Sequence, residues 1–207
     1  MDASDPVRTR LLAIARELFS AKGYEETSVR EITTAADANL GAITYHFGSK
    51  EALYHASIES VADPLVEAVS AASRHPGSAL DRLEAIVRAV LEHLTGNPGA
   101  PRILLRELAG DRPIAAPMAN AMRRNLGVLV QVITDGQREG TIRPGDPVLL
   151  ALSVVAQPFF ISVAGRLVRE AFDVDRDDPT VRARVVEHVV EGVRRLVVGR
   201  GTMDEER

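Results

Sequence analysis

The chain of 207 residues contains no cysteine, so disulfides, zinc sites built on thiolates and cysteine nucleophiles are all excluded. Long apolar runs are also missing. The longest apolar tract, residues 148–164, is interrupted by Ser153, Gln157, Pro158 and Ser162, and a membrane span needs about 18 consecutive apolar residues. The first residues, Met-Asp-Ala-Ser-Asp, lack the basic and apolar stretches of a signal peptide, so a cytoplasmic location is expected.

The chain carries less positive charge than a protein that coats nucleic acid would need. The formal net charge is −4, and 45% of the residues are hydrophobic, which favours a folded core over disorder. Residues 1–57 hold six basic and eight acidic side chains, a balance of −2. Bulk charge therefore excludes a polycationic coat but not a sequence-specific DNA reader, whose contacts depend on where each group points.

Strand-like alternation is nearly absent, and apolar residues recur at helical spacing along most of the chain. The pattern predicts an all-α protein of about nine helices, in which three short helices lead and longer ones follow. Gly23 and Gly140 lie where helices should end, and Pro64 should bend the fourth helix. The expected helices cover residues 7–22, 29–36, 39–47, 49–73, 78–95, 101–109, 113–138, 147–171 and 180–198.

Residues 28–47 predict a helix-turn-helix, which is two short helices joined by a tight turn. Ser28 is the expected N-cap, and Glu31 completes a capping box with it. In such a motif the second helix enters the major groove of DNA and presents side chains to base edges. Ile43 and Phe47 share the face that should pack inward. The residues left facing outward are Leu40, Gly41, Ala42, Thr44, Tyr45 and His46.

Neighbouring side chains are placed to hold DNA phosphates. Ser28 begins the first helix of the motif, where free backbone N–H groups can bind a phosphate. Arg30 projects from its first turn, and Lys50 lies near the start of the next long helix. Tyr45 and His46 can donate hydrogen bonds. Contacts of this kind fix the register on DNA while the outward face reads the bases, although the same face could also be ordinary solvent-exposed helix.

Taken in register, residues 8–54 resemble the DNA-binding domain of TetR-family (TetR/AcrR-like) transcriptional regulators. The resembling stretches are Leu18-Phe19, Gly23-Tyr24, Thr27 to Ile32, Ala35-Ala36, Gly41-Ala42-Ile43 and Tyr45 to Tyr54. Two departures are visible: Asp37-Ala38 stands where the family usually has Gly-Val, and Thr44 stands where it often has Tyr. The residues expected to contact DNA are Ser28, Arg30, Asn39, Leu40, Gly41, Ala42, Thr44, Tyr45, His46 and Lys50.

The resemblance implies a helix-turn-helix domain over residues 5–54, a helical effector-binding and dimerisation domain over residues 55–198, and a tail over residues 199–207. The helices expected at 147–171 and 180–198 would form a four-helix bundle with their symmetry mates. Such a homodimer fits a palindromic double-stranded operator. A sequence-specific repressor, released from its operator by a small-molecule effector, is therefore the expected function.

An effector site between helices should be mostly apolar with a few polar groups. The residues considered for it are His93, Arg106, Met118, Met122, Gln157, Phe159 and Phe160. Methionine and phenylalanine at helical spacing usually belong to the core. Gln157 is more informative, because a buried amide in an apolar helix needs hydrogen-bond partners. The expected partner at this site is a small-molecule effector, and no cofactor is expected.

Two other classes compete with this interpretation of the sequence. His55 and Glu59 lie four residues apart and could form a catalytic or ligand pair, but such a pair is usually a surface contact. The chain has no nucleophile elbow, P-loop or dinucleotide fingerprint, so neither catalytic residues nor enzyme activity are expected. The second alternative is a helical protein-interaction module with reduced or lost DNA binding, which the departures in the turn and the balance of −2 favour slightly.

An acidic loop near the C-terminus imitates the beginning of a calcium site. Asp173, Asp175 and Asp177 have the right spacing, but the loop lacks the glycine and glutamate required at its sixth and twelfth positions. We therefore expect no metal there, only a solvated turn in which Asp178 caps the last helix.

Overall fold

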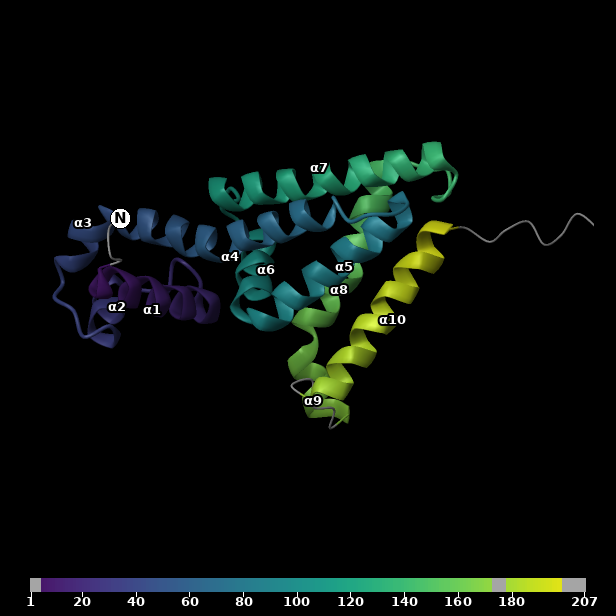
Figure 1. Ribbon diagram of the computed structural model, residues 1–207. Coiled ribbons are helices and arrows are strands. Elements are labelled where there is room, and N and C mark those ends of the chain that lie inside the picture. The colour runs from purple at the N-terminus through teal and green to yellow at the C-terminus, as the bar shows by residue number, and fades with distance from the viewer. Residues whose placement is uncertain (1–4, 173–177, 199–207) are drawn as a thin grey trace, which may run out of the picture. The chain divides into compact units, whose positions relative to one another are not determined.

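The computed structural model describes residues 5–172 and 178–198, and in these ranges every regular element is an α-helix (Figure 1). This confirms the all-α class. The helices of the described residues are α1 (Pro6–Lys22), α2 (Val29–Ala35), α3 (Ala42–Phe47), α4 (Lys50–Ala72), α5 (Ala79–Gly96), α6 (Gly99–Ala109), α7 (Ala116–Glu139), α8 (Pro147–Val163), α9 (Gly165–Phe172) and α10 (Pro179–Val198).

The chain forms two compact units. The N-terminal unit combines Met1–Pro64 with Asn97–Ala121, and the C-terminal unit combines Leu65–Gly96 with Met122–Arg207. Helix α6 is thus part of the N-terminal unit, while the functional division expected between residues 54 and 55 stays a prediction.

One expected helix is two helices in the structure. Residues 147–171 were predicted as a single helix, but α8 ends at Val163 and α9 begins at Gly165. Ala164 between them has ψ −2° and donates its N–H to the carbonyl oxygen of Phe160 at 2.8 Å. Pro158, inside α8, has no N–H for the helical ladder, and glycine is a poor helix former, so this stretch is weak. Pro64, by contrast, lies within a continuous α4.

Large apolar side chains from four helices fill the core of the N-terminal unit. Phe19 of α1, Ile32 of α2, Ile43 of α3 and Leu53 of α4 are all at most 1% exposed. Helix α1 ends where predicted, at Gly23, whose φ of +86° suits glycine and whose N–H donates to the carbonyl oxygen of Phe19 at 2.9 Å. Helix α2 packs on α1, and α3 packs on α2.

Helix α6 is fastened to the end of α1 by Arg106. Its Nε donates to the carbonyl oxygen of Ser20 at 3.3 Å, and a terminal guanidinium nitrogen donates to that of Ala21. These carbonyls belong to the last turn of α1, where the helix has no N–H groups left to satisfy them. A charged donor at a helix C-terminus also interacts favourably with the helix dipole. Helix α6 is therefore an integral part of the N-terminal unit.

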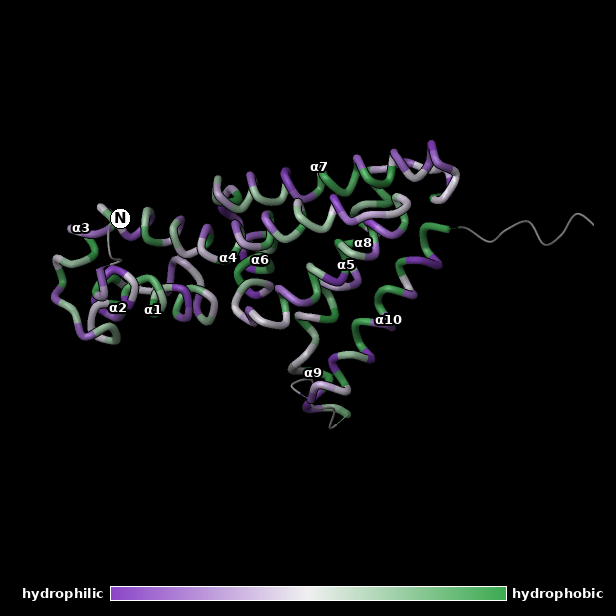
Figure 2. The backbone as a smooth tube through the Cα atoms, in the orientation of Figure 1, coloured by the Kyte–Doolittle hydropathy of each residue, from purple (hydrophilic) through white to green (hydrophobic). Residues whose placement is uncertain are grey.

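The core of the C-terminal unit lies between α5, α8 and α10, which contact one another. Hydrophobic and hydrophilic residues alternate along α10 (Figure 2). Its valines Val189, Val190, Val193 and Val197 are at most 5% exposed. The helix expected at 180–198, which was predicted to join the dimer interface, therefore places these valines in the core of the chain's own unit. Arg143 closes the end of this helix, because its Nε donates to the carbonyl oxygen of Leu196 at 2.8 Å.

Candidate nucleic-acid interface

Helices α2 and α3 and the turn between them form a helix-turn-helix at the N-terminal end of the chain (Figure 1). The N-cap of α2 is as predicted: Ser28 Oγ accepts from the N–H of Glu31 at 3.1 Å. Helix α3 begins later than predicted, at Ala42, whose N–H donates to the carbonyl oxygen of Asn39 at 3.0 Å. Gly41 is its N-cap and makes no side-chain capping bond.

The turn is held by Arg10 of α1. Its Nε donates to the carbonyl oxygen of Ala36 at 2.5 Å, and a terminal nitrogen donates to that of Asp37 at 3.3 Å. Asp37 has φ +46°, in the left-handed region that strains most residues and that aspartate tolerates better than most. Arg10 thus secures the turn at the point where this sequence departs from the usual Gly-Val.

No charged side chain lies on the outward face formed by α3 and by residues 39–41 before it. Tyr45 is 84% exposed and Leu40 is 55% exposed, and Asn39, Gly41 and Thr44 are exposed beside them. The expectation that Ala42 also faces outward was wrong. Its side chain is 7% exposed, because it packs with Ile43 on the inner side of the short helix.

His46 is turned toward α1 rather than outward as predicted. Its Nδ1 lies 3.5 Å from a carboxylate oxygen of Asp5, and its side chain is only 10% exposed. The same Asp5 carboxylate caps α1 by accepting from the N–H of Val7 at 2.9 Å. His46 therefore joins the last turn of α3 to the first turn of α1.

The start of α2 has free donors for a phosphate. Ser28 and Arg30 are both exposed, and the hydroxyl of Ser28 keeps its proton available while its oxygen caps the helix. The carboxylate of Glu31 pairs with Lys22 of α1. That hydrogen bond lowers the pKa of Glu31, and the backbone of Ser28 contributes in the same direction. The capping box and an ion pair thus fix the first turn of α2.

Lys50, at the start of α4, lies over an aromatic ring. Its Nζ is 4.2 Å from the ring centroid of Tyr24, and the guanidinium carbon of Arg112 is also 4.2 Å from it. Tyr24 belongs to a cluster with Phe19 and Tyr54, whose ring centroids lie 6.1 and 5.0 Å away. Sequence reasoning noted Tyr24 only as part of a motif and missed Arg112, which carries no local pattern.

Tyr54 ties this cluster to α6. Its hydroxyl donates to a carboxylate oxygen of Glu107 at 2.5 Å. Burial raises the pKa of the Tyr54 phenol, and the neighbouring Glu107 carboxylate raises it further. The other oxygen of Glu107 accepts from the N–H of Ala115 at 2.6 Å, which holds the loop between α6 and α7.

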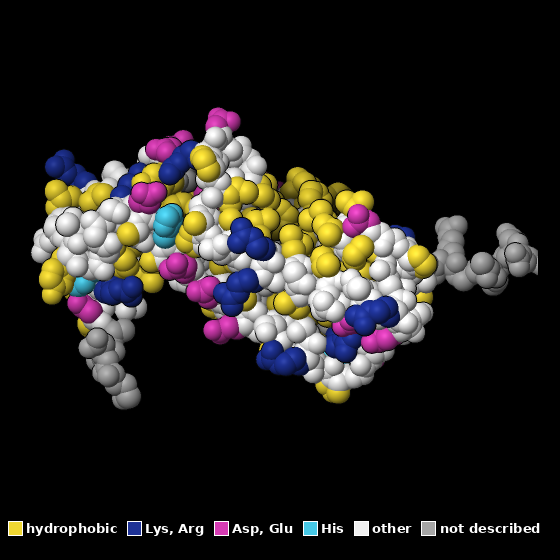
Figure 3. Space-filling view, turned by 90° about the horizontal axis from the view of Figure 1, so that it is seen from above, with side chains coloured by type: hydrophobic (Ala, Val, Ile, Leu, Met, Phe, Trp, Pro, Cys, Tyr) yellow, Lys and Arg dark blue, Asp and Glu magenta, His cyan; other side chains and the backbone are white. Residues whose placement is uncertain are grey.

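Basic and acidic side chains are interspersed on the face seen in Figure 3. The guanidinium carbon of Arg8 lies 4.9 Å from the ring centroid of Phe47, which places its positive charge beside α3. Any attraction for DNA must come from individually placed groups of this kind.

The residues considered for an effector site are divided between the two units. Arg106 and Met118 belong to the N-terminal unit, where Arg106 is bound to α1 and Met118 is 6% exposed. In the C-terminal unit, His93 is half-buried in α5, and Phe160 of α8 is 67% exposed. Met122 is half-buried in α7, and Phe159 is half-buried in α8.

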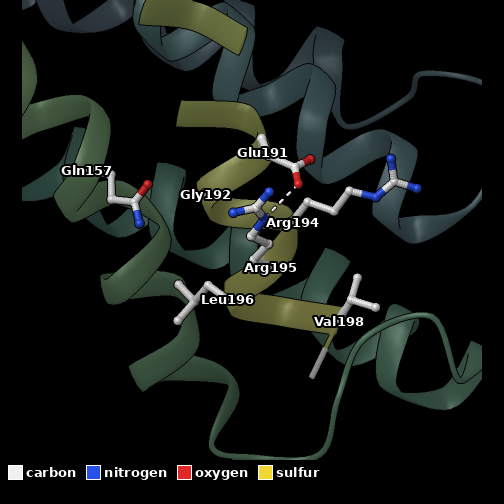
Figure 4. Close-up of a pocket in the computed structure, with 7 residues that line it drawn as sticks. All are labelled: Gln157, Glu191, Gly192, Arg194, Arg195, Leu196 and Val198. Carbon is white, nitrogen blue, oxygen red and sulfur yellow. Dashed lines mark hydrogen bonds and ion pairs between the residues drawn. The ribbon is translucent and has the colours of Figure 1, made fainter. Parts of the chain in front are cut away.

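Gln157 lines a pocket of about 680 Å³ against α10 (Figure 4). A Cβ atom on Gly192 would lie 2.8 Å from Gln157 Oε1, so the side-chain amide of Gln157 lies directly against this glycine of α10. Arg195 and Arg194 line the pocket with their charges engaged, the first by Glu191 at 2.7 Å and the second by Glu84 at 3.7 Å. The remaining lining residues are Leu196 and Val198.

In the part of the chain that the structure describes, no three His, Asp or Glu side chains gather as metal ligands. None of its helices is long and apolar enough to cross a membrane. Asp173, Asp175 and Asp177 lie outside the described residues. Asp178 caps α10 as predicted, because its carboxylate accepts from the N–H of Thr180 at 2.7 Å.

Comparison with known proteins gives a consistent result. A family model described as bacterial regulatory proteins of the tetR family matches residues 11–57, and a tetracyclin repressor-like C-terminal domain matches residues 80–193. The HTH-type transcriptional regulator UidR of Escherichia coli K12 is 30% identical over 146 residues, which span 68% of this chain and 71% of that protein.

Solved structures share the fold. A bacterial regulatory protein of the tetR family from Rhodococcus RHA1 is 28% identical and aligns with a TM-score of 0.73 over 92% of this chain and 98% of its own. AibR, crystallised with isovaleryl coenzyme A and operator DNA, aligns with a TM-score of 0.71 at 21% identity, over 91% of this chain and 97% of its own.

Proposed function

Because this chain belongs to the TetR family of transcriptional regulators, which bind DNA through a helix-turn-helix, we propose that it is a homodimeric repressor released from a palindromic operator by a small molecule. The observation that carries the proposal is the exposed, uncharged face formed by α3 and by residues 39–41 before it. The buried side chain of Ile43 holds the inner side of α3, and Arg10 holds the turn that precedes this helix.

The proposed contacts divide into two groups. Base edges are read by the exposed residues Asn39, Leu40, Gly41, Thr44 and Tyr45. Phosphates are held by Ser28, Arg30 and Lys50, which set the register. Ala42 and His46 support the interface from within, since the first is buried against the motif and the second is held by Asp5.

The proposed dimer forms through α8 and α10. Several large apolar side chains on these helices are exposed within the single chain. They are Val148, Leu149, Leu152 and Phe160 on α8 and Val198 on α10. An apolar surface of this kind favours association with another protein surface. In a two-fold dimer the recognition helices lie about 34 Å apart or more, which matches successive major grooves.

Effector control is proposed by analogy with AibR, whose structure contains both a coenzyme A ester and operator DNA. A ligand that binds one conformation of the dimer better than the other shifts the population toward it. We keep His93, Met122 and Gln157 as proposed contacts in the C-terminal unit. Arg106 is instead assigned to anchoring α1, Met118 to the core, and Phe160 to the dimer surface. The proposal includes a cytoplasmic location and no catalytic activity.

The test is to select duplexes from a randomised DNA pool with the purified protein and to measure affinity for the enriched sequence by fluorescence anisotropy. We expect enrichment of a palindromic site, and weaker binding by Ser28→Ala and Lys50→Ala. Arg102→Ala is the control, because Arg102 is an exposed arginine of α6 remote from the proposed contacts in sequence. Absence of any enriched duplex at low salt would contradict the proposal and favour a protein-interaction module.

A further inference from the structure

The ring of Tyr24 carries two cations from distant parts of the N-terminal unit. Lys50 Nζ and the guanidinium carbon of Arg112 each lie 4.2 Å from its centroid. The face of an aromatic ring attracts positive charge, so both contacts are favourable. Lys50 is a phosphate ligand in the proposed function, whereas Arg112 lies in the loop after α6, outside the helix-turn-helix and outside every contact proposed above.

Arg112 is held in place by its surroundings. Its terminal nitrogen lies 3.0 Å from a carboxylate oxygen of Glu25, the residue that follows Tyr24. Arg112 therefore contacts two consecutive residues, through the ring of Tyr24 and the carboxylate of Glu25. The ring of Tyr24 is therefore in contact with Arg112 as well as with its aromatic neighbours Phe19 and Tyr54.

The loop that carries Arg112 is fixed on both sides. Before it, Arg106 attaches α6 to the last turn of α1. After it, the N–H of Ala115 donates to Glu107, whose other carboxylate oxygen accepts from the Tyr54 hydroxyl. The loop that places the Arg112 guanidinium on Tyr24 is thus fixed by contacts within the same unit that contains Lys50.

We propose that Arg112 is a positioning residue for DNA binding, which acts through the Tyr24 ring to hold Lys50 where it meets a phosphate. This inference rests on the proposed function. A lysine side chain is flexible, and a contact formed by a free lysine must first restrict its rotamers. A ring clamped by Arg112 pre-organises the ammonium group, so that less conformational freedom is lost when DNA binds. Without Arg112 the lysine keeps its charge but not its fixed position.

The test compares full-length variants on the duplex that the wild-type protein enriches, by fluorescence anisotropy across a series of salt concentrations. Arg112→Ala should weaken binding about fivefold, the size of an exposed cation–π contact. Arg112→Ala should also make the slope of log affinity against log salt concentration shallower, as Lys50→Ala does. Each phosphate that is no longer neutralised reduces the magnitude of that slope by about 0.9. In a Lys50→Ala background, Arg112→Ala should change affinity less than twofold, about the additivity error of independent sites.

Three further variants separate positioning from other roles. Arg112→Lys keeps a cation near the ring but loses the planar guanidinium, so it should restore part of the affinity that Arg112→Ala loses. Tyr24→Phe keeps the ring and should bind like the wild type. Arg102→Ala removes an arginine from the same unit and should leave the affinity nearly unchanged. Thermal melting of each variant reports whether the unit is still folded.

Four outcomes overturn the inference. In the first, Arg112→Ala leaves the affinity for DNA unchanged. In the second, Arg112→Ala weakens the affinity equally with and without Lys50, which would mean that Arg112 makes an independent contact or that the unit has lost structure. Arg102→Ala could produce the same loss, which would mean overall charge alone. If no duplex is enriched by the wild type, the proposed function fails together with the inference. If a duplex is enriched and the two substitutions are additive, only the inference fails.

Discussion

Arg10 of α1 caps the C-terminus of α2 by donating from Nε to the carbonyl oxygen of Ala36 at 2.5 Å. The same arrangement recurs where Arg106 binds the end of α1 and where Arg143 binds the end of α10. Each arginine satisfies carbonyl groups that the helix cannot satisfy itself. In all three cases the cap comes from a separate element, so it stabilises packing as well as the helix end.

The turn held by Arg10 contains a residue in an unfavourable conformation. Asp37→Gly should raise the free energy of unfolding by about 0.5–1 kcal/mol, because glycine adopts the left-handed φ of +46° without steric cost. Urea denaturation is the measurement. Asp37→Ala, which keeps the steric cost, should be no more stable than the wild type. If glycine gives no gain, Asp37 is not strained. Binding to the enriched duplex should persist, since Arg10 contacts only the backbone of this turn.

Leu40 should read thymine. Its side chain is 55% exposed beside small and polar neighbours, and the methyl group of thymine is the apolar feature of the major groove. Replacing thymidines of the enriched duplex by deoxyuridine should weaken wild-type binding about fourfold for each contacted methyl, from about 0.8 kcal/mol per buried carbon.

The control for this prediction is Leu40→Ala, which should bind more weakly than the wild type and respond little to deoxyuridine. Leu105→Ala, at an exposed leucine of α6, should retain the wild-type response. An equal response of Leu40→Ala and wild type to deoxyuridine would show that Leu40 does not contact the methyl groups.

Local signals were enough to predict much of the fold and of the helix-turn-helix. The bond from the N–H of Glu31 to Ser28 and the cap formed by Asp178 both join residues at most three apart, so short spacings reveal them. The break at Ala164 was missed because the apolar pattern continues across it. The burial of Ala42 also depends on where a six-residue helix begins, which a period of 3.6 residues does not define.

Contacts between distant residues could not be predicted in the same way. Arg10 reaches across 26 positions to Ala36, and Arg106 reaches across 85 to Ala21. Nothing in the neighbourhood of either arginine marks its partner. Periodicity also shows that one side of α10 is apolar without showing what covers it. In the structure, α5 and α8 contact α10, and apolar residues of α10 such as Val193 are buried.

The dimer proposed through α8 can be tested at its exposed apolar residues. Leu149→Glu and Phe160→Glu should each convert the protein to monomers, because a buried, unpaired carboxylate opposes association. These side chains are 62% and 67% exposed in the single chain, so the fold should survive. Sedimentation velocity and circular dichroism measure the two properties. Leu105→Glu, on α6, is the matched control and should remain dimeric. Dimers that persist in both α8 variants would place the interface elsewhere.

Tyr54 should give the protein a characteristic alkaline sensitivity. Burial and the Glu107 carboxylate raise the pKa of its phenol in the folded state. The neutral phenol therefore stabilises the fold fully below the ordinary tyrosine pKa of about 10, and this contribution is lost as the pH rises through the higher folded-state value. Tyr54→Phe keeps the ring but removes the bond to Glu107, and should lower the free energy of unfolding at neutral pH by about 1–3 kcal/mol.

The comparison that decides this prediction is the dependence of unfolding free energy on pH, measured for both proteins by urea denaturation from neutral to strongly alkaline conditions. The wild-type curve should fall more steeply than that of Tyr54→Phe above the ordinary tyrosine pKa. Parallel curves would mean that the phenol of Tyr54 does not titrate differently in the folded and unfolded states.

Lys22 and Lys50 are the two lysines among the 25 basic residues, and both lie in the N-terminal unit. One pairs with Glu31 between α1 and α2, and the other lies on Tyr24. Reagents that acylate primary amines will thus find side-chain targets only beside the recognition motif, while every guanidinium cap stays untouched. In a Lys22→Arg variant, where Lys50 is the one remaining lysine, an amine-reactive photo-crosslinking group at Lys50 would replace its charge and report whether DNA lies beside the start of α4, without any engineered cysteine.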